Sequence, residues 1–303
     1  MQTQYSYQAA LAASEAIRWR VEDIIGGERG LDFTKPFLPE ALARTAPLAF
    51  LTPDERRTLN QIRGHAYLCI FGLVEEFILP FVLDHARPAL DADDYRTRAL
   101  LQFAGEEAKH IQLFKRFREE FARGFGAECA VIGPPREIAR AVLAHDPLSV
   151  ALAILHIEWM TQRHYTESVK EDGDLDPQFK SLLRHHWMEE AQHAKLDTLM
   201  VEALAAGRGP GALTAAVEGY LEIGGFIDGG LAQQVEFDLA ALTRATGRVL
   251  DEAEQAEFRR VQRQANRWTY LGSGMSHEQV LATLARLSPG ARARVEAVAP
   301  AFC

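Results

Sequence analysis

Trp187-Met188-Glu189-Glu190-Ala191-Gln192-His193 decides the fold of this chain, and a near-copy, Gly105-Glu106-Glu107-Ala108-Lys109-His110, lies upstream. Both stretches contain Glu-x-x-His at the same offset, because 190 − 107 and 193 − 110 both give 83. Residues three apart share one face of a helix, so each motif presents a carboxylate and an imidazole together. Two such helices, each preceded by a helix with an inward glutamate, are the ligand set of a four-helix bundle that holds two iron or manganese ions. The sequence therefore predicts an all-α bundle built around a two-metal centre.

The length and composition of the chain fit one soluble domain with a buried core. The chain has 303 residues, of which 48% are hydrophobic and 25% are charged. Its formal net charge is −9, and no run of lysine and arginine stands out. This balance argues against nucleic acid and anionic membranes as partners.

The cysteines and the apolar segments indicate a cytoplasmic protein. Cys69, Cys129 and Cys303 are widely spaced, which fits a reducing compartment and gives neither a disulfide framework nor a thiolate metal site. The N-terminal stretch lacks the features of a signal peptide. The most apolar run, residues 77–83, is short and contains Pro80, so we expect a buried helix there and no membrane span.

Cap and proline signals predict the four helices of the bundle. Thr52 and Glu55 can form a capping box with Pro53 in the first turn, and Pro88 blocks continuation of the helix. Asp146-Pro147 and Asp176-Pro177 are two further cap-plus-proline starts. The four helices are expected at 53–86, from near Asp93 to about 124, at 147–170 and at 177–206.

The flanks are expected to add helices to the same domain. The spacing of small and apolar residues predicts a helix over 5–25, followed by a wrapping loop over 26–52. Gly133-Pro134-Pro135 is expected to begin a connection. Additional helices are predicted at about 212–245, at about 250–271 and from Ser276. We predict one domain over 1–303, with the metal-binding bundle at about 53–206 and the extra helices at about 212–290.

His186 is the third imidazole that we expect in the site. It lies four residues before Glu190 and seven before His193, so all three share a helical face. His185 is turned roughly 100° away and is not expected to be a ligand. Glu158 is also a candidate, because a carboxylate in so apolar a run is costly unless it is paired or bound to a metal.

The first bundle helix offers two adjacent glutamates, and two arguments disagree on the choice. The repeat offset favours Glu75, because 158 − 75 is again 83. The helical face favours Glu76, which lines up with apolar residues, whereas Glu75 lines up with Arg57 and Gln61. Loop lengths drift more easily than the face of a continuous helix, so we choose Glu76.

The predicted ligands are four carboxylates and three imidazoles: Glu76, Glu107, His110, Glu158, His186, Glu190 and His193. Such donors suit iron or manganese, whereas zinc more often brings thiolate. The first glutamate of each pair, Glu106 or Glu189, is expected to flank the site or to support a ligand. Four carboxylates neutralise two divalent ions and leave open positions for dioxygen.

This pattern resembles the bacterial di-iron arylamine N-oxygenases of the aminobenzoate N-oxygenase type. In that family a ferritin-like bundle gains a histidine ligand one turn before the last Glu-x-x-His, which here is His186-x-x-x-Glu190-x-x-His193. The resemblance covers about residues 55–205. It implies a ferritin-like di-iron oxygenase of a biosynthetic pathway that uses dioxygen to oxidise a small-molecule amine to hydroxylamine, nitroso or nitro. It favours two iron ions, with manganese as the alternative.

The partners follow from the same interpretation. The sequence has no glycine-rich nucleotide motif and no cysteine cluster, so an external electron donor, reductase or peroxide is implied. We expect a monomer or a homodimer. Three alternatives stay open: a di-iron hydroxylase acting on carbon, a ferritin-like ferroxidase or iron-storage protein, and a metal-free helical scaffold with uncompensated buried carboxylates. Phe103, Trp159, Tyr165 and Tyr220 are candidates either for a substrate pocket or for the core.

Overall fold

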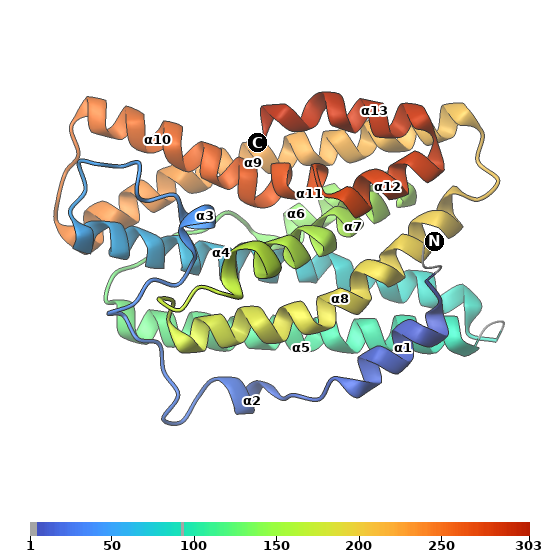
Figure 1. Ribbon diagram of the computed structural model, residues 1–303, viewed down its shortest axis with the longest axis horizontal. Helices are drawn as coiled ribbons and strands as arrows, with labels where there is room; N and C mark the ends of the chain where they lie inside the picture. Colours follow the sequence, from blue (N-terminus) through green and yellow to red (C-terminus); the bar gives the residue numbers. More distant parts are fainter. Residues whose placement is uncertain (1–4, 92–93) are drawn as a thin grey trace.

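The bundle consists of four long helices, which we describe from a computed structural model covering residues 5–91 and 94–303 (Figure 1). They are α4 (Pro53–Ala86), α5 (Asp94–Phe125), α7 (Pro147–His164) and α8 (Pro177–Ala205). Helix α4 packs along α5, and α7 packs along α8. No strand occurs within the described ranges, so the predicted all-α fold is confirmed. Asp93, near which the second helix was expected to begin, lies outside the described residues.

The predicted helix starts are present as hydrogen-bonded caps. The Thr52 side chain accepts a hydrogen bond from the Glu55 amide, and the Glu55 carboxylate accepts one from the Thr52 amide, at 3.2 and 2.8 Å. Asp146 accepts a hydrogen bond from the Leu148 amide at 2.9 Å and caps α7. Asp176 caps α8 by accepting a hydrogen bond from the Phe179 amide at 2.6 Å. These side chains satisfy amides that have no partner within the helix.

The remaining helices cover the bundle from two sides. Helices α1 (Tyr7–Ala16) and α2 (Val21–Ile24) lie along α5 and α8, and α3 (Glu40–Ala43) lies against α4 and α10. Helix α9 (Pro210–Thr246) packs on α4 and α7 at the other side (Figure 1). The last helices are α10 (Glu252–Arg267), α11 (Ser273–Met275), α12 (Glu278–Leu287) and α13 (Pro289–Val298).

Two flanking segments differ from the sequence prediction. The single helix expected over 5–25 is wrong, because α1 ends at Ala16 and the chain is not helical from Ile17 to Arg20. This break lets the Trp19 ring stack on the ring of His110, with centroids 6.1 Å apart. The connection expected after Gly133 contains α6 (Pro135–Leu143), which Pro135 opens in its first turn.

Two of the predicted helices end in a wider turn. Helix α7 continues through a π-helical turn at Tyr165–Val169, and α10 continues through another at Trp268–Gly272. Their combined ends lie close to the expected ends at 170 and 271. The sequence therefore placed these two helix ends well, although it could not show the change in hydrogen bonding.

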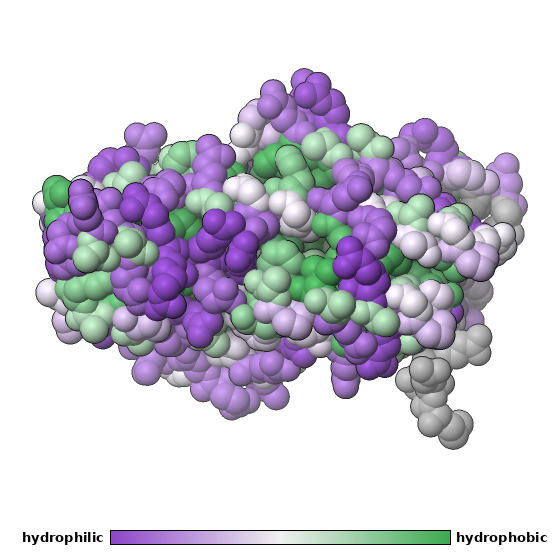
Figure 2. Space-filling view, turned by 90° about the horizontal axis from the view of Figure 1, so that it is seen from above, coloured by the Kyte–Doolittle hydropathy of each residue, from purple (hydrophilic) through white to green (hydrophobic). Residues whose placement is uncertain are grey.

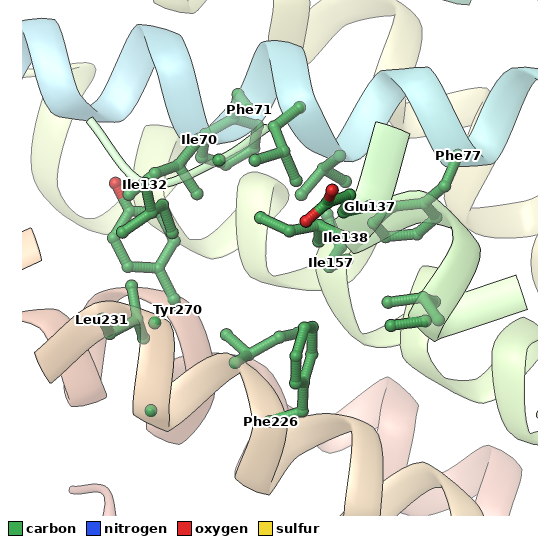
Figure 3. Close-up of a pocket in the computed structure, with 18 of the residues that line it drawn as sticks. Ile70, Phe71, Phe77, Ile132, Glu137, Ile138, Ile157, Phe226, Leu231 and Tyr270 are labelled. Atoms are coloured by element: carbon green, nitrogen blue, oxygen red, sulfur yellow. The ribbon is translucent and has the colours of Figure 1, made fainter. Parts of the chain in front are cut away.

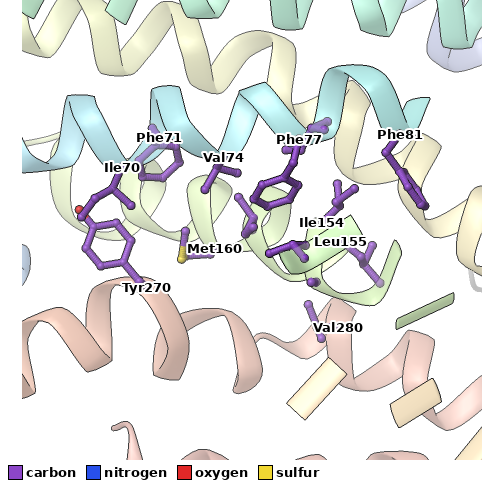
Figure 4. Close-up of a cluster of buried hydrophobic side chains, with 14 of the residues drawn as sticks. Ile70, Phe71, Val74, Phe77, Phe81, Ile154, Leu155, Met160, Tyr270 and Val280 are labelled. Carbon is purple, nitrogen blue, oxygen red and sulfur yellow. The ribbon is translucent and has the colours of Figure 1, made fainter. Parts of the chain in front are cut away.

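Apolar side chains from α4 and α7 form the core beside the bundle axis. Figure 4 shows Phe77 of α4 on the side of Ile154 and Leu155 of α7, and Phe71 of α4 on the side of Met160. By length and composition alone α4 could cross a membrane, but 72% of its most apolar window is buried within the protein. This burial fits the prediction of a core helix. Figure 2 shows hydrophilic residues over much of one face, around a hollow with hydrophobic walls.

Candidate metal centre

Two groups of buried imidazoles and carboxylates meet inside the bundle. The first group is Glu75, His110, His186 and Glu190, and the second is Glu107, His110, Glu190 and His193. Each residue offers a ligand atom, and the atoms of a group lie within 4.8 Å of one another. His110 and Glu190 belong to both groups. The bundle therefore offers two adjacent positions for metal ions with two side chains in reach of both.

Glu190 of α8 lies at the centre of this arrangement. Its Oε1 atom is 2.6 Å from Nε2 of His186 and 3.1 Å from Nδ1 of His110. Its Oε2 atom is 3.1 Å from Nδ1 of His193. One oxygen thus faces each group, which is the arrangement that a bridging carboxylate requires.

The ligand atoms are close together, and some of them form hydrogen bonds with one another, as Nε2 of His186 does with Glu75 and Nδ1 of His193 does with Glu190. Among the described residues, Nδ1 of His110, Oε1 of Glu190, Oε2 of Glu75 and both oxygens of Glu107 are buried without a hydrogen-bond partner. A buried polar atom without a partner costs free energy, so such a cluster is rare unless another group satisfies it. The converging oxygen and nitrogen lone pairs fit divalent ions of the iron and manganese type.

The choice of Glu76 as the first ligand is corrected by the structure. Glu76 is exposed, whereas Glu75 is 2% exposed and places Oε1 3.1 Å from Nε2 of His186. The argument from the helical face failed because the polar side of α4 is also buried. Gln61, which marked that side, donates hydrogen bonds to the carbonyls of Phe33 and Lys35 in the wrapping loop. The repeat offset of 83 residues gave the better choice.

The other six predicted ligands all lie in the interior. Five of them, Glu107, His110, His186, Glu190 and His193, belong to the two groups. Glu158 of α7 is buried beside Glu190 but belongs to neither group. Burial raises the pKa of Glu158, and the neighbouring Glu190 carboxylate raises it further. Such a group gains most from a nearby cation, which would favour its charged form.

The outer nitrogens of two histidines are held by the first glutamates of the repeated motifs. Nε2 of His110 lies 2.9 Å from Glu189, and Nε2 of His193 lies 2.9 Å from Glu106. Each motif thus supports the histidine of the other motif. Fixing the outer nitrogen directs Nδ1 of each ring to the interior and raises its basicity as a ligand. The role expected for Glu106 and Glu189 agrees with these contacts.

Burial and carboxylates act in opposite directions on these histidines. Burial lowers the pKa of His110 and of His193, because it disfavours the charged imidazole. Hydrogen bonds to the surrounding carboxylates outweigh burial, so both pKa values lie above the usual range. The surrounding carboxylates therefore favour positive charge at the centre.

One interior carboxylate was missed in the sequence. Asp197 of α8 is fully buried, and neither of its oxygens has a hydrogen-bond partner within the described part of the chain. Burial raises its pKa, which the nearby His193 imidazole partly offsets. The sequence does contain the signal, because His186, Glu190, His193 and Asp197 follow one another at helical spacing.

His185 and the aromatic candidates lie outside the two groups. His185 pairs through Nδ1 with the Ser181 carbonyl at 2.7 Å, as expected for a residue off the ligand face. Phe103 stacks on the His193 ring with centroids 3.9 Å apart. Tyr220 lies 2.7 Å from Nδ1 of His156, away from the ligands. These aromatics pack around the centre or in the core.

The chain matches no protein-family model and no curated protein sequence. It is similar to solved structures of R2-like ligand-binding oxidase variants. One variant, with an anaerobically reconstituted Mn/Fe cofactor, is 14% identical over 89% of this chain and 94% of the other, with a TM-score of 0.47. Another, with an aerobically reconstituted Fe/Fe cofactor, has the same identity and coverage and a TM-score of 0.49. These values assign the chain to no family.

Proposed function

We propose that this protein is a non-haem di-iron oxygenase that uses dioxygen to oxidise a small-molecule amine at nitrogen. The observation that carries the proposal is the pair of buried ligand groups that share His110 and Glu190. Two adjacent ions held by carboxylates and imidazoles are suited to the redox chemistry of dioxygen. Manganese in one or both positions is the alternative to iron.

Each ion would have its own ligands and a shared set. Glu75 and His186 would hold one ion, and Glu107 and His193 would hold the other, with Glu190 and His110 in reach of both. Glu158, buried beside Glu190, would add a carboxylate to those of Glu75, Glu107 and Glu190, and four carboxylates balance two divalent charges. Glu189 and Glu106 keep two imidazoles in the orientation that ligation requires.

The reaction balances with an external donor of electrons. An amine, dioxygen, two electrons and two protons give a hydroxylamine and one water, and further rounds would give the nitroso and nitro compounds. The candidate ligands are buried, which would keep bulk water away from the reacting atoms. Oxidation at nitrogen, as opposed to carbon, is supported by the third imidazole, His186, which is the feature shared with the arylamine N-oxygenases.

Metal loading is the first test. The protein is loaded with ferrous iron without oxygen, desalted and analysed for metals, and its optical spectrum is followed on admission of air. We expect two irons per chain and a spectral change that depends on oxygen. Protein that retains no iron would refute the di-iron centre. If manganese is the only metal found, the centre would be assigned to manganese in place of iron.

Turnover separates the remaining alternatives. Iron-loaded protein is supplied with a chemical reductant, air and either aniline, which is uncharged at neutral pH, or a hydrocarbon of similar size, and products are identified by mass spectrometry. Oxidised nitrogen is the expected product, whereas hydroxylated carbon alone would indicate the carbon hydroxylase. A ferritin-like storage protein would elute from a sizing column as a very large assembly, whereas we expect a monomer or dimer.

A further inference from the structure

A large apolar cavity lies between α4, α6, α7 and α9. Its volume is about 540 Å³, which is within the range of small-molecule sites. Figure 3 shows side chains from these helices pointing into it, and the apolar ones include Ile70, Phe71, Phe77, Ile157, Phe226 and Leu231. We call this cavity the α4–α7 chamber.

We propose that the α4–α7 chamber binds uncharged, apolar molecules and delivers them to the metal centre as its substrates. The second part of this inference rests on the proposed function, whereas the binding of apolar molecules does not. Three features of the cavity support the proposal: its distance from the ligands, the position of its charged residues and the glycines at its wall.

Only one layer of side chains separates the chamber from the ligands. The Phe71 ring lines the chamber and also packs edge-on against the His186 ring, with centroids 5.6 Å apart. Val74 and Ile157 line the chamber, and the next residues in the chain are Glu75 and Glu158. Rotation of the Phe71 ring would therefore place a molecule in the chamber next to the first ligand group.

The charged residues of the chamber lie on its outer side. Among its lining residues only Glu137 and Arg140 are charged, and both are exposed side chains of α6. The walls contributed by α4 and α7 are apolar. A charged ligand would lose its hydration on entering this part without gaining an ion pair, which is costly. An ammonium group would stay near Glu137, so a molecule that reaches Phe71 must enter uncharged.

Glycines of α9 leave part of the wall open. A glycine within a helix costs roughly 0.5–1 kcal/mol relative to alanine, so it often has a packing reason. Gly224 has one, because a side chain there would meet Met275 at 3.1 Å. Gly229 lines the chamber, and a Cβ atom there would meet nothing within 4 Å. Phe226, one turn earlier, lines the same wall and is 47% exposed, as expected beside an entrance for apolar molecules.

Binding of N-phenylnaphthylamine, an uncharged probe that fluoresces in apolar surroundings, tests the chamber. The filling variant is Gly229→Phe, and the matched control is Gly225→Phe, an exposed position on α9 that does not line the chamber. We expect the probe to bind the original protein and Gly225→Phe equally, and Gly229→Phe at least tenfold more weakly. Equal affinity for all three proteins would overturn the proposal.

Two further measurements keep the test decisive. If Gly229→Phe fails to fold, as judged by circular dichroism, Gly230→Leu fills the adjacent wall, where a Cβ atom would lie 3.4 Å from Ile132. Competition tests the ligand class: octanol should displace the probe, and octane-1,8-diammonium at the same concentration should not, because one of its two charged ends would have to enter the apolar part. Displacement by both compounds alike would contradict the requirement for an uncharged ligand.

Failure of the chamber and failure of the proposed function give different results. In iron-loaded protein, Gly229→Phe should keep two irons per chain and raise the KM for the amine at least tenfold. If the protein retains no iron but the probe discriminates Gly229→Phe from Gly225→Phe, the oxygenase is refuted and the apolar site stands. If amines are oxidised and Gly229→Phe changes neither KM nor probe binding, the chamber is refuted and the oxygenase stands.

Discussion

At the scale of single residues, Glu190 couples the two halves of the centre. Its two oxygens face different histidines, at 2.6 Å from His186 and at 3.1 Å from His193. Glu75 and Glu107 each belong to only one group. Loss of Glu190 would therefore affect both metal positions, whereas loss of a peripheral carboxylate would affect one.

The first prediction compares the two adjacent glutamates of α4. Glu75→Gln should reduce the iron content from about two to about one per chain, because an amide cannot supply the negative charge of a carboxylate. Glu76→Gln should leave the iron content unchanged, because Glu76 is exposed. Elemental analysis after anaerobic loading measures both. Loss of iron in Glu76→Gln with full retention in Glu75→Gln would reverse our assignment.

The second prediction concerns the added imidazole. His186→Ala should keep the helical fold and lose iron from one position, because it removes one of the three histidines around Glu190. His185→Ala is the matched control, since its side chain pairs with the Ser181 carbonyl outside the groups. Iron content and circular dichroism of the two variants provide the measurement. Equal iron content in both variants would show that His186 is not a ligand.

The residues of the centre differ in how far the sequence could predict them. Glu107, His110, Glu190 and His193 follow from helical spacing and repetition, which need no tertiary information. The choice between Glu75 and Glu76 depends on what covers α4, and the wrapping loop buries a side that looks polar. Asp197 lies on the same helical face as His193, so the sequence places it there, but the burial of its carboxylate is seen only in the structure.

At the scale of helices, α5 and α8 support each other through their motifs. Glu106 of α5 holds His193 of α8, and Glu189 of α8 holds His110 of α5. Lys109 pairs with Glu189 and lies over the Trp19 ring at 3.9 Å. The repeated sequence motif thus produces a reciprocal contact, which aligns the two helices along the metal centre.

The third prediction compares the N-terminal caps of α7 and α8. Asp176 is buried and accepts hydrogen bonds from the amides of Phe179 and Asp32, whereas Asp146 is exposed. Asp176→Ala should lower the free energy of unfolding by about 2 kcal/mol, since two amides, one buried and one partly buried, lose their partner. Asp146→Ala should cost about 1 kcal/mol. Urea denaturation measures both, and a larger loss in Asp146→Ala would contradict the argument.

The helices also show where prediction from local sequence ends. Thr52, Asp146 and Asp176 marked helix starts correctly, because a cap is satisfied by amides only a few residues away. The break after Ala16 has no local cause in the sequence. It brings Trp19 against His110, a residue 91 positions later in the chain (110 − 19), so only the tertiary structure determines it.

At the scale of the whole molecule, the helices outside the four-helix bundle cover part of its surface. Helix α9 packs on α4 and α7, and α6 closes another side of the α4–α7 chamber. A buried ion pair joins α9 to α4, with 3.7 Å between the Arg63 guanidinium and the Asp238 carboxylate. The packing of these helices determines access to the centre as well as stability.

The fourth prediction is a dependence of stability on pH that originates in this ion pair. Burial raises the pKa of Asp238 to about 6, although Arg63 and a hydrogen bond from Gln234 act to lower it. The folded protein therefore binds the proton more tightly than the unfolded chain, whose Asp pKa is about 3.9. Protonation of Asp238 therefore stabilises the folded protein. This stabilisation is fully present below about pH 4 and is lost as the pH rises through about 6. The total is about 3 kcal/mol, from about two pKa units at about 1.4 kcal/mol each.

Asp238→Asn isolates this effect, because asparagine cannot ionise and can still accept the hydrogen bond from Gln234. Urea denaturation between about pH 4 and about pH 7 gives the free energy of unfolding of the variant minus that of the original protein. We expect this difference to rise by about 2 kcal/mol across the range, in favour of the variant, with the rest of the total found below about pH 4. Asp228→Asn is the control: pairing with Arg267 lowers the pKa of Asp228, so its difference should stay flat above about pH 5. A flat difference for Asp238→Asn as well would mean that Asp238 keeps its charge in the folded protein across this range, and that Arg63 compensates fully for its burial.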